Sequence, residues 1–403
     1  MNLDQILQAR LQQRRELNLY RSRKTVQSPQ ATHIKVDGKA LLNFCSNDYL
    51  GLANHPDVTA RLKQAADNFG VGSGASHLVN GHTAEHHALE QELAAFTGRE
   101  RALLFSTGYM ANMGVINALV GKGDFILQDK LNHASLIDGG LLSSAASARF
   151  NHGDMQHLQQ RLASSQSGQR LIATDGVFSM DGDLAKLPEL ASMSERHDAW
   201  LLVDDAHGFG CIGEQGRGSV SHFGLDQNAV PVLIGTLGKA FGTFGAFVAG
   251  SEALIESLIQ FSRTYIYTTA MPAAIAAATR CSLELLIAGD QRRQHLNDLI
   301  SQFRQGCSRL GLTLMDSDSP IQPVLVGDAQ QAINMSQFLM DKSCWVSAIR
   351  PPTVPKNTAR LRVTLTASHT SEQVDQLLSA FAYALERMSS TQIVGADKPQ
   401  NSD

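Results

Sequence analysis

The sequence predicts an α/β protein built on a mostly parallel sheet. Between about residue 51 and residue 285, short apolar runs alternate with amphipathic stretches, and this alternation is typical of parallel strands joined by helices. Small and polar residues follow several of these runs, at the edge of the sheet where open α/β folds bind ligands. The predicted strands are residues 102–105, 125–127, 171–173, 200–203 and 232–234.

Four parts follow one another along the chain. Residues 1–50 are expected to form an N-terminal arm, with a helix supported by apolar residues at helical spacing and a short hairpin. Residues 51–285 form the large domain, and residues 286–390 form a smaller C-terminal α+β domain. The polar residues 391–403 are expected to be a disordered tail.

The smaller domain follows a long helical region that extends from about residue 271 to residue 310. Its apolar residues recur in some stretches at the spacing of a strand and in others at the spacing of a helix, which predicts both kinds of element. The predicted strands are residues 322–326, 345–349 and 360–365, and the predicted helices are residues 329–342 and 372–388.

Composition and charge exclude several classes of protein. The 403 residues include 34 Lys and Arg against 38 Asp and Glu, so the formal charge of −4 gives no general attraction to nucleic acid. The five cysteines are scattered and never show a Cys-x-x-Cys spacing, which argues against a disulfide framework and favours a reducing cytoplasm. No apolar run reaches the roughly 18 residues of a membrane span, and the N-terminus lacks the apolar core of a signal peptide.

Lys239 and Asp204 are the two residues that indicate a catalytic function. Lys239 lies among closely spaced glycines, which indicates a backbone approached by another group rather than a solvated surface lysine. Asp204 directly follows an apolar run, so it should be partly buried and paired with a cation. The alternative is that it caps the next helix, a role that fits Asp205 equally well. An amine that can form an imine, with an acid that keeps a pyridinium nitrogen protonated, is the pairing that pyridoxal phosphate (PLP) requires. The sequence therefore predicts an enzyme with this cofactor.

Three further positions are candidates for cofactor contacts. The turn at Ser106 to Gly108 begins a helix, whose free N–H groups favour a phosphate. His133 lies in a loop after a predicted strand, where its imidazole either stacks on a heteroaromatic ring or caps a helix. His207 either reaches the phenolic oxygen of the cofactor or is an ordinary turn residue.

Two other kinds of site fit the sequence less well. The segment Gly235 to Lys239 is similar to a P-loop, but its glycines are too close together and Ala240 replaces the required Ser or Thr. A histidine-rich segment places His86 and Glu90 on the expected solvent face of a helix, with no third ligand at a suitable spacing, so we expect no metal site. That segment contains His77, His82, His86 and His87 beside Glu85 and Glu90.

Six motifs together resemble the α-oxoamine synthases, which are PLP enzymes, and the resemblance covers most of the chain, from about residue 43 to residue 366. The resemblance implies the type I PLP-dependent transferase fold, in which a large domain with a mostly parallel seven-stranded sheet carries a smaller C-terminal α+β domain and an N-terminal arm. The motifs are residues 43–51, Gly-Ser-Gly at 72–74, Asp-Gly-Val-Phe-Ser-Met-Asp-Gly at 175–182, Asp-Asp-Ala-His-Gly at 204–208, Gly-Glu-Gln-Gly-Arg-Gly at 213–218 and Thr-Leu-Gly-Lys-Ala-Phe-Gly at 236–242.

The resemblance implies a role for each candidate residue. Lys239 would bind the cofactor aldehyde, Asp204 would pair with the pyridine nitrogen and His133 would stack on the ring; these three are the predicted catalytic residues. The other predicted cofactor contacts are Ser179 and His207 near the phenolic oxygen, Gly108, Tyr109 and Thr236 mainly at the phosphate, and Thr268 and Thr269 at the phosphate of a partner subunit. The predicted substrate contacts are Arg21 and Thr353 for the acyl group, Arg350 for the amino-acid carboxylate, and His133.

The resemblance also implies substrates and partners. Residues 347–355 are similar to family members that join L-alanine to a pimeloyl thioester, whereas sibling enzymes use glycine or serine with other acyl-CoAs. The family forms its site between two subunits, which implies a homodimer. Coenzyme A and acyl carrier protein both stay open as the acyl carrier, and a non-catalytic cofactor-binding protein is the alternative from another class.

Overall fold

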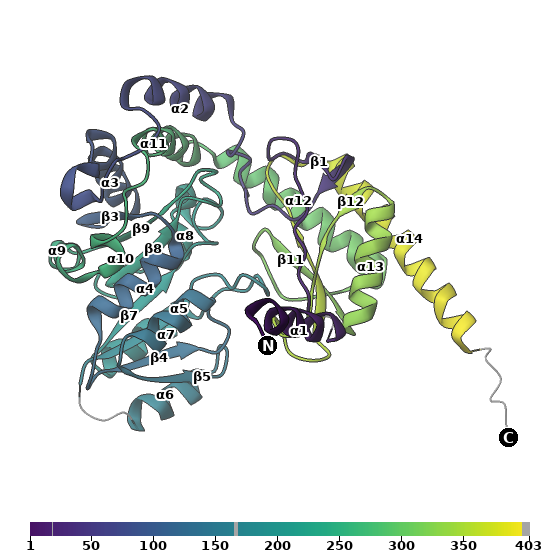
Figure 1. Cartoon of the computed structure of the whole chain (residues 1–403). Helices are drawn as coiled ribbons and strands as arrows, with labels where there is room; N and C mark the ends of the chain where they lie inside the picture. Colours follow the sequence, from purple (N-terminus) through teal and green to yellow (C-terminus); the bar gives the residue numbers. More distant parts are fainter. Residues whose placement is uncertain (18, 165–167, 397–403) are drawn as a thin grey trace.

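The chain folds into a large α/β part and a smaller α+β part, joined by a long helix, in a computed structural model (Figure 1). The structure describes residues 1–17, 19–164 and 168–396. No helix within these ranges is long and apolar enough to span a bilayer. The predicted division at residue 285 lies near the end of helix α11 (Ala273–Ile287), where the large part gives way to α12 (Asp290–Arg309).

A seven-stranded sheet forms the centre of the large part, and its strand order is β3-β9-β8-β7-β6-β4-β5. Strand β9 is antiparallel to both of its neighbours, whereas the pairs β7–β8, β6–β7, β4–β6 and β4–β5 are parallel, which confirms the predicted mostly parallel sheet. The strands are β3 (Arg101–Phe105), β4 (Phe125–Asp129), β5 (Ala146–Phe150), β6 (Arg170–Asp175), β7 (Ala199–Asp204), β8 (Val232–Thr236) and β9 (Ala246–Gly250).

Five of these seven strands are the predicted ones, and β5 and β9 are additional. Strand β5 lies at the edge of the sheet and buries mainly Phe150, so it lacks an apolar run. Strand β9 is buried along its whole length but consists largely of Ala and Gly, which carry little strand preference. Both strands form because neighbouring strands supply their hydrogen bonds.

Helices cover both faces of this sheet (Figure 1). Helices α2 and α11 pack against each other, as do α4 and α5. The remaining bounds are α2 (Pro56–Phe69), α3 (Ala84–Thr97), α4 (Gly108–Leu119), α5 (Ala134–Leu142), α6 (Met155–Ser164), α7 (Leu187–Arg196), α8 (Gly218–His222), α9 (Glu252–Phe261) and α10 (Arg263–Ile266), with a π-helical turn at His77–Gly81 and a 3₁₀ turn at Glu214–Gly216.

Separate apolar clusters cover the two faces of the seven-stranded sheet. Side chains alternate along each strand, so Leu201 and Val203 join one cluster and Leu202 joins the other. All three are fully buried, and burial of such a side chain stabilises the fold by about 1.5–3 kcal/mol. The first cluster continues into the small part through residues such as Val324, so one core supports both parts.

The small part contains the predicted elements and also incorporates the N-terminal arm. Its four-stranded sheet has the order β10-β11-β14-β13, and β2 of the arm hairpin pairs with β12 in a second sheet. Residues about 300 positions apart are therefore neighbours, which no local pattern predicts. The bounds are α1 (Leu3–Glu16), β1 (His33–Val36), β2 (Lys39–Asn43), β10 (Thr313–Leu314), β11 (Ile321–Gly327), α13 (Ala329–Asp341), β12 (Cys344–Trp345), β13 (Ser347–Ile349), β14 (Ala359–Thr364) and α14 (Ser371–Ala396).

Two expectations need correction. Helix α14 continues to Ala396, so a disordered tail from residue 391 is wrong for its first six positions, and residues 397–403 lie outside the described residues. The solvent-facing position expected for His86 and Glu90 on α3 is also wrong. His86 is completely buried and the Glu90 side chain is only 12% exposed, because α3 packs this face against β3.

Candidate active site

The carboxyl ends of the central strands bring the predicted carboxylate and amine into one region. Strands β6 and β7 pair in a register that places Asp175 opposite Asp204. Strand β8 lies on the other side of β7 and leads directly into the loop that carries Lys239. This arrangement is the edge at which open α/β sheets bind ligands.

Lys239 has an amine that is easier to deprotonate than an ordinary lysine. Burial lowers its pKa from 10.5 to about 8, against the opposing pull of the Asp204 and Asp175 carboxylates, while the charge of Arg362 lowers it further. A lysine with a pKa near 8 keeps a useful fraction of neutral amine at physiological pH, as a nucleophile or a general base requires.

The Asp204 carboxylate is held in place by neutral donors. It is 6% exposed, its Oδ1 accepts from the backbone N–H of Ala206 at 3.0 Å and its Oδ2 accepts from Nδ2 of Asn112 at 2.6 Å. Asn112 also donates to the hydroxyl of Ser135. Neutral donors orient the carboxylate without cancelling its charge, so it can still stabilise a cation in the cleft.

Asp205 has a different environment from Asp204. It is completely buried, and its Oδ2 accepts from the backbone N–H of Ser219 at 2.6 Å. Burial raises its pKa to about 7. This contact holds the first turn of α8, so the two adjacent acids have different partners, which the sequence left open.

His207 lies below the cleft as a neutral imidazole. Its Nδ1 shares a 2.6 Å hydrogen bond with the hydroxyl of Tyr49. Burial, followed by the charges of Lys239 and Arg362, lowers its pKa well below the usual range. Tyr49 therefore fixes the ring and occupies one of its nitrogens, which leaves Nε2 for a ligand.

His133 both caps a helix and contacts the site. It is the N-cap of α5, where its Nδ1 lies 2.7 Å from the hydroxyl of Ser135. Its backbone N–H donates to Oδ2 of Asp175 at 2.7 Å. Burial lowers its pKa, and the Asp204 and Lys239 charges act on it in opposite directions. The two interpretations of His133 are therefore compatible, since the cap fixes the loop that carries the ring.

The N-terminus of α4 provides a place for an anion. Thr107 is its N-cap, and a β-carbon added to Gly108 would meet no atom within 4 Å, so the space in front of the helix is open. Tyr109 is exposed, and its hydroxyl donates to Asp138. Free N–H groups and the helix dipole favour a phosphate at such a position.

The other predicted phosphate contacts lie near this helix end. Thr236 ends β8, and its hydroxyl donates to the carbonyl of Gly245. The backbone carbonyl of Thr269 accepts from Ser106, which places the Thr268–Thr269 segment beside the same turn of its own chain. The contact of Thr268 and Thr269 with a partner subunit stays a prediction.

Three of the four predicted substrate residues line a separate small pocket. Arg21 from the arm and Arg350 and Thr353 from the small part line a pocket of about 180 Å³. Thr353 also donates its backbone N–H to the carbonyl of Arg350. The structure thus groups these three residues, although they are 332 positions apart at most (353 minus 21). We call this pocket, formed by the arm and the small part, the rim.

Several residues that support the site escaped the sequence prediction. Asn112 holds Asp204, Tyr49 holds His207 and Asp175 holds the His133 loop. Arg362 is 8% exposed, donates to the carbonyl of Ser179 at 2.7 Å and acts electrostatically on Lys239. Tyr49 and Asp175 lie inside motifs of the family, and this position could have identified them from the sequence. Arg362 reaches the cleft only in the folded chain.

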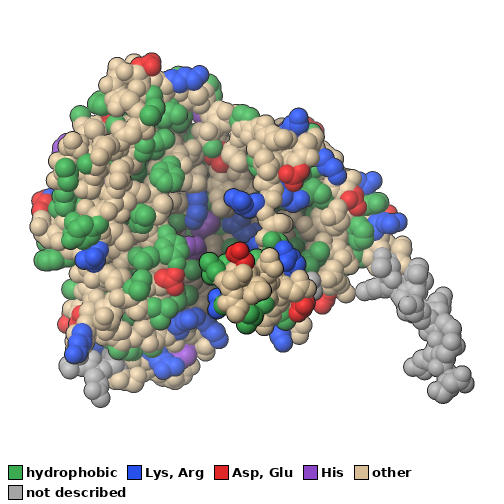
Figure 2. All heavy atoms as spheres, viewed as in Figure 1, with side chains coloured by type: hydrophobic (Ala, Val, Ile, Leu, Met, Phe, Trp, Pro, Cys, Tyr) green, Lys and Arg blue, Asp and Glu red, His purple; other side chains and the backbone are tan. Residues whose placement is uncertain are grey.

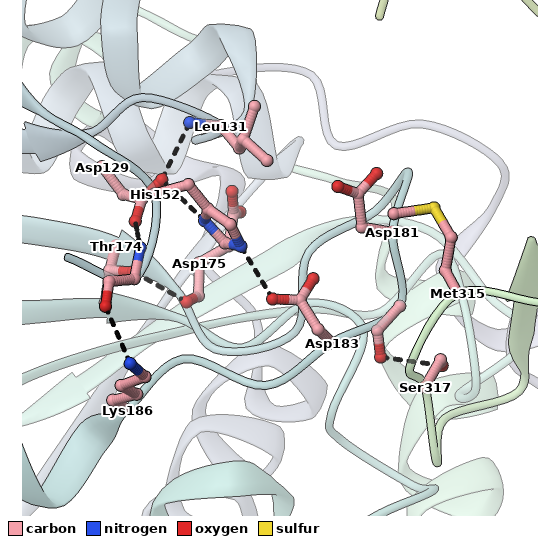
Figure 3. A network of polar contacts seen from close by, with 12 residues as sticks. Asp129, Leu131, His152, Thr174, Asp175, Asp181, Asp183, Lys186, Met315 and Ser317 are labelled. Carbon is pink, nitrogen blue, oxygen red and sulfur yellow. Dashed lines mark hydrogen bonds and ion pairs between the residues drawn. The ribbon is translucent and has the colours of Figure 1, made fainter. Parts of the chain in front are cut away.

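We call the strand ends that carry Asp204, His207 and the Lys239 loop the floor of the site. A network around His152 fixes a neighbouring loop and connects it with the small part (Figure 3). Its Nδ1 lies 3.0 Å from Asp129 and its Nε2 lies 2.8 Å from Asp183. Although partial burial opposes it, hydrogen bonding to these two carboxylates raises the pKa of His152 to about 10. Asp181, in the same loop as Asp183, pairs with Arg360 of β14. The loop that carries Ser179 is therefore fixed from both sides.

Taken together, these groups fit a phosphate-bearing pyridine aldehyde. A hollow containing Lys, Arg and His side chains opens between the two parts of the molecule (Figure 2). For such a ligand the strand ends and the neighbouring helix supply an amine of lowered pKa, a buried carboxylate and a helix N-terminus. The amide oxygen of Asn112, beside that carboxylate, has no hydrogen-bond partner among the described residues.

The comparison with known families agrees with this geometry. Residues 39–381 match the family model of class I and II aminotransferases. The chain belongs to this family. Curated relatives named 8-amino-7-oxononanoate synthase include one from Saccharophagus degradans, which is 60% identical over 96% of this chain and 98% of its own length. Another, from Cellvibrio japonicus, is 60% identical over 98% of both chains.

Solved structures of family members have the same fold. A serine palmitoyltransferase from Sphingomonas wittichii superposes with a TM-score of 0.92, at 34% identity over 97% of this chain and 100% of its own. An 8-amino-7-oxononanoate synthase from Francisella tularensis superposes with a TM-score of 0.76, at 34% identity over 87% of this chain and 99% of its own. The two family members carry different names, so the shared fold does not by itself select a substrate.

Proposed function

We propose that the chain is a PLP-dependent 8-amino-7-oxononanoate synthase, which joins L-alanine to a pimeloyl thioester and releases carbon dioxide and the free thiol carrier. This reaction is a step of biotin synthesis. The observation that carries the proposal is the 60% identity with enzymes of this name over nearly the full chain. The amine and carboxylate at the sheet edge supply the groups that such chemistry requires.

The residues of the floor would hold the cofactor. When bound, pyridoxal phosphate supplies an aldehyde that condenses with amines and a ring that delocalises the electron pair of a substrate α-carbon. Lys239 would bind at the aldehyde, Asp204 at the ring nitrogen and His133 at the ring face. Gly108, Tyr109 and Thr236 would hold the phosphate, and Ser179 and His207 would lie near the phenolic oxygen.

Lys239 supplies the base in this proposal. A general base works best when its pKa is near the working pH, and the pKa of about 8 meets that condition. The amine takes the α-proton of alanine and returns a proton to the product carbon after carbon dioxide leaves. Asn112 and Ala206 donate to the two oxygens of Asp204 and so hold its carboxylate in place during these transfers.

Two arginines are candidates for the alanine carboxylate. Arg350 was selected by resemblance and lines the rim pocket. Arg362 is buried nearer the reacting groups, since its charge acts on both Lys239 and His207. The arginine that binds the carboxylate should raise the KM for alanine when replaced, and the one that binds the acyl chain should raise the KM for the thioester.

The proposed enzyme is a cytoplasmic homodimer. All five cysteines are free, which is typical of a reducing compartment. Phe261 and Tyr267, on either side of α10, are 65% and 72% exposed, and exposed large apolar side chains are common at subunit interfaces. Thr268 and Thr269 follow this patch directly and would reach the phosphate of the partner subunit.

The test is a substrate panel on the purified holoenzyme. L-Alanine, glycine and L-serine are each combined with pimeloyl-CoA and pimeloyl acyl carrier protein, and carbon dioxide release and product mass are measured. Alanine should react fastest, and the preferred donor identifies the acyl carrier. Faster reaction of glycine or serine would assign a sibling synthase instead. If the protein releases no carbon dioxide and does not exchange the α-proton of alanine in deuterated buffer, it is a non-catalytic cofactor-binding protein.

A further inference from the structure

A second group of chemically active side chains lies outside the cleft, at the beginning of α3. His87 and Glu90 are one helical turn apart on this helix, and His82 lies in the segment that leads into it. One ligand atom from each residue lies within 4.8 Å of the others. The distance between Nε2 of His82 and Oε2 of Glu90 is 3.9 Å. Folding therefore supplies the third ligand that spacing along the sequence did not reveal.

The hydrogen bonds of the neighbouring histidines leave His82 with one nitrogen to offer. Its Nδ1 lies 3.0 Å from Nδ1 of His77, which leaves Nε2 facing Glu90. Histidine binds metals through a ring nitrogen of the neutral imidazole, and Nε2 is the nitrogen of His82 placed to do so. His77 then orients the ligand from outside the metal site. Metal-bound histidines usually have such a partner at their second ring nitrogen.

His86 is excluded as a ligand by its own hydrogen bonds. The backbone N–H of Thr83 donates to its Nδ1 at 3.1 Å, and its Nε2 donates to the carbonyl of Met271 at 2.7 Å. Both nitrogens are therefore occupied. The bond to Met271 connects the cluster to the segment that carries Thr269. The isolated β-bridge between Ser76 and Thr269 is a second contact with that segment.

Glu90 is a largely buried carboxylate that faces His82. Its side chain is 12% exposed, and its Oε1 accepts from the backbone N–H of Leu104 at 3.0 Å. Taking a carboxylate out of water is costly unless a positive charge compensates it. A divalent cation between Glu90 and His82 would provide that charge.

We propose that His82, His87 and Glu90 form a Zn²⁺ site whose fourth position is open to water. Two imidazoles and one carboxylate are a ligand set that suits zinc, whereas Mg²⁺ and Ca²⁺ prefer oxygen ligands alone. Zinc bonds of about 2.0–2.1 Å bring tetrahedral ligand atoms to roughly 3.4 Å from one another. To reach this spacing the exposed His87 side chain would rotate inward and leave Gln91; the Nε2 atoms of these two residues are 3.2 Å apart.

The experiment measures zinc binding rather than turnover, so it is independent of the proposed function. Holoenzyme freed of metals with a chelator is dialysed against Zn²⁺, and the bound metal is measured by mass spectrometry. We expect one Zn²⁺ per chain and at least tenfold weaker binding in His87→Gln, the range seen when metal sites lose a supporting group. His222→Gln, at a histidine outside the cluster, is the matched control and should bind as the wild type does.

Two further measurements decide the interpretation. Added Zn²⁺ should raise the melting temperature of the wild type and of His222→Gln but not of His87→Gln, because a ligand that binds only the folded state stabilises it. Equal zinc affinity in the wild type, His87→Gln and Glu90→Gln would overturn the site. His87 is exposed on a helix surface, so His87→Gln should stay folded and keep the test decisive even if Glu90→Gln does not.

Discussion

The floor and the rim of the cleft are built in different ways. The floor comes from neighbouring strand ends of one sheet, where Asp204 and His207 are buried and already hydrogen-bonded. The rim comes from the arm and the small part, where Arg21 and Thr353 are exposed. The difference indicates that the proposed reacting groups are oriented before any ligand arrives, whereas the proposed substrate contacts depend on how separate segments meet. Floor variants should therefore change kcat, and rim variants should change KM.

The largest effect is expected from Lys239→Ala. The change removes both the proposed point of attachment of the cofactor and the proposed base, so turnover should fall by at least about a thousandfold, which corresponds to about 4 kcal/mol of lost transition-state stabilisation. Carbon dioxide release from L-alanine measures the loss, and borohydride reduction followed by peptide mapping shows whether the cofactor is attached. The control is Lys122→Ala, at an exposed lysine. Turnover within tenfold of the wild type would disprove the role of Lys239.

The adjacent acids provide the second test. Asp204→Asn keeps the shape of the side chain but removes the charge, so kcat should fall by about a hundredfold or more, or about 3 kcal/mol. Asp205→Asn should change kcat by less than about threefold, because burial already raises the pKa of Asp205 to about 7 and its contact is with Ser219. Steady-state kinetics on both variants gives the answer. The reverse order would move the catalytic role to Asp205.

The sequence predicted most of the fold and identified the candidate groups of the floor, because both depend on local pattern. The catalytic roles of these groups stay predictions. Apolar runs followed by Asp204 and by the Lys239 loop marked two neighbouring strand ends. Strand β9 was missed because its Ala and Gly residues gain their stability from pairing on both sides. Arg362 was missed because its position depends on the packing of the small part against the loop at Ser179.

The same limit explains the histidine cluster. His86 and Glu90 were assigned to solvent because charged and polar residues usually face water. Their burial depends on β3 and on the carbonyl of Met271, which are distant in sequence. Local pattern therefore predicts elements and reacting groups, and fails where one element sets the environment of another.

The third test concerns the connection between floor and small part through His152. Because the pKa of His152 is raised from 6.5 to about 10 in the folded state, its contribution to stability is complete below about pH 6.5 and is lost as the pH rises toward 10. His152→Gln should lower the free energy of unfolding at pH 6 by about 2–4 kcal/mol. Urea denaturation at pH 6 and pH 9 measures this.

The wild type should lose more stability than His152→Gln between these two pH values. His157→Gln, at a histidine outside the network, is the control and should follow the wild type. Parallel losses in the wild type and His152→Gln would show that His152 is not the titrating group. The network also fixes the Ser179 loop, so kcat should decrease slightly in His152→Gln if the floor depends on that loop.

The smallest effects are expected at the rim. Thr353→Val keeps the size of the side chain but removes its hydroxyl, and Arg350→Ala removes a charge beside it; each should raise one KM by about tenfold, or about 1.4 kcal/mol, and change kcat by less than threefold. Arg362→Ala should instead lower kcat as well, because removal of its charge lets the pKa of Lys239 rise from about 8. Separate KM values for alanine and the thioester assign each residue to a substrate. If Arg350→Ala lowered kcat as strongly as Arg362→Ala, the separation between floor and rim would fail, because a rim residue would then act on the reacting atoms.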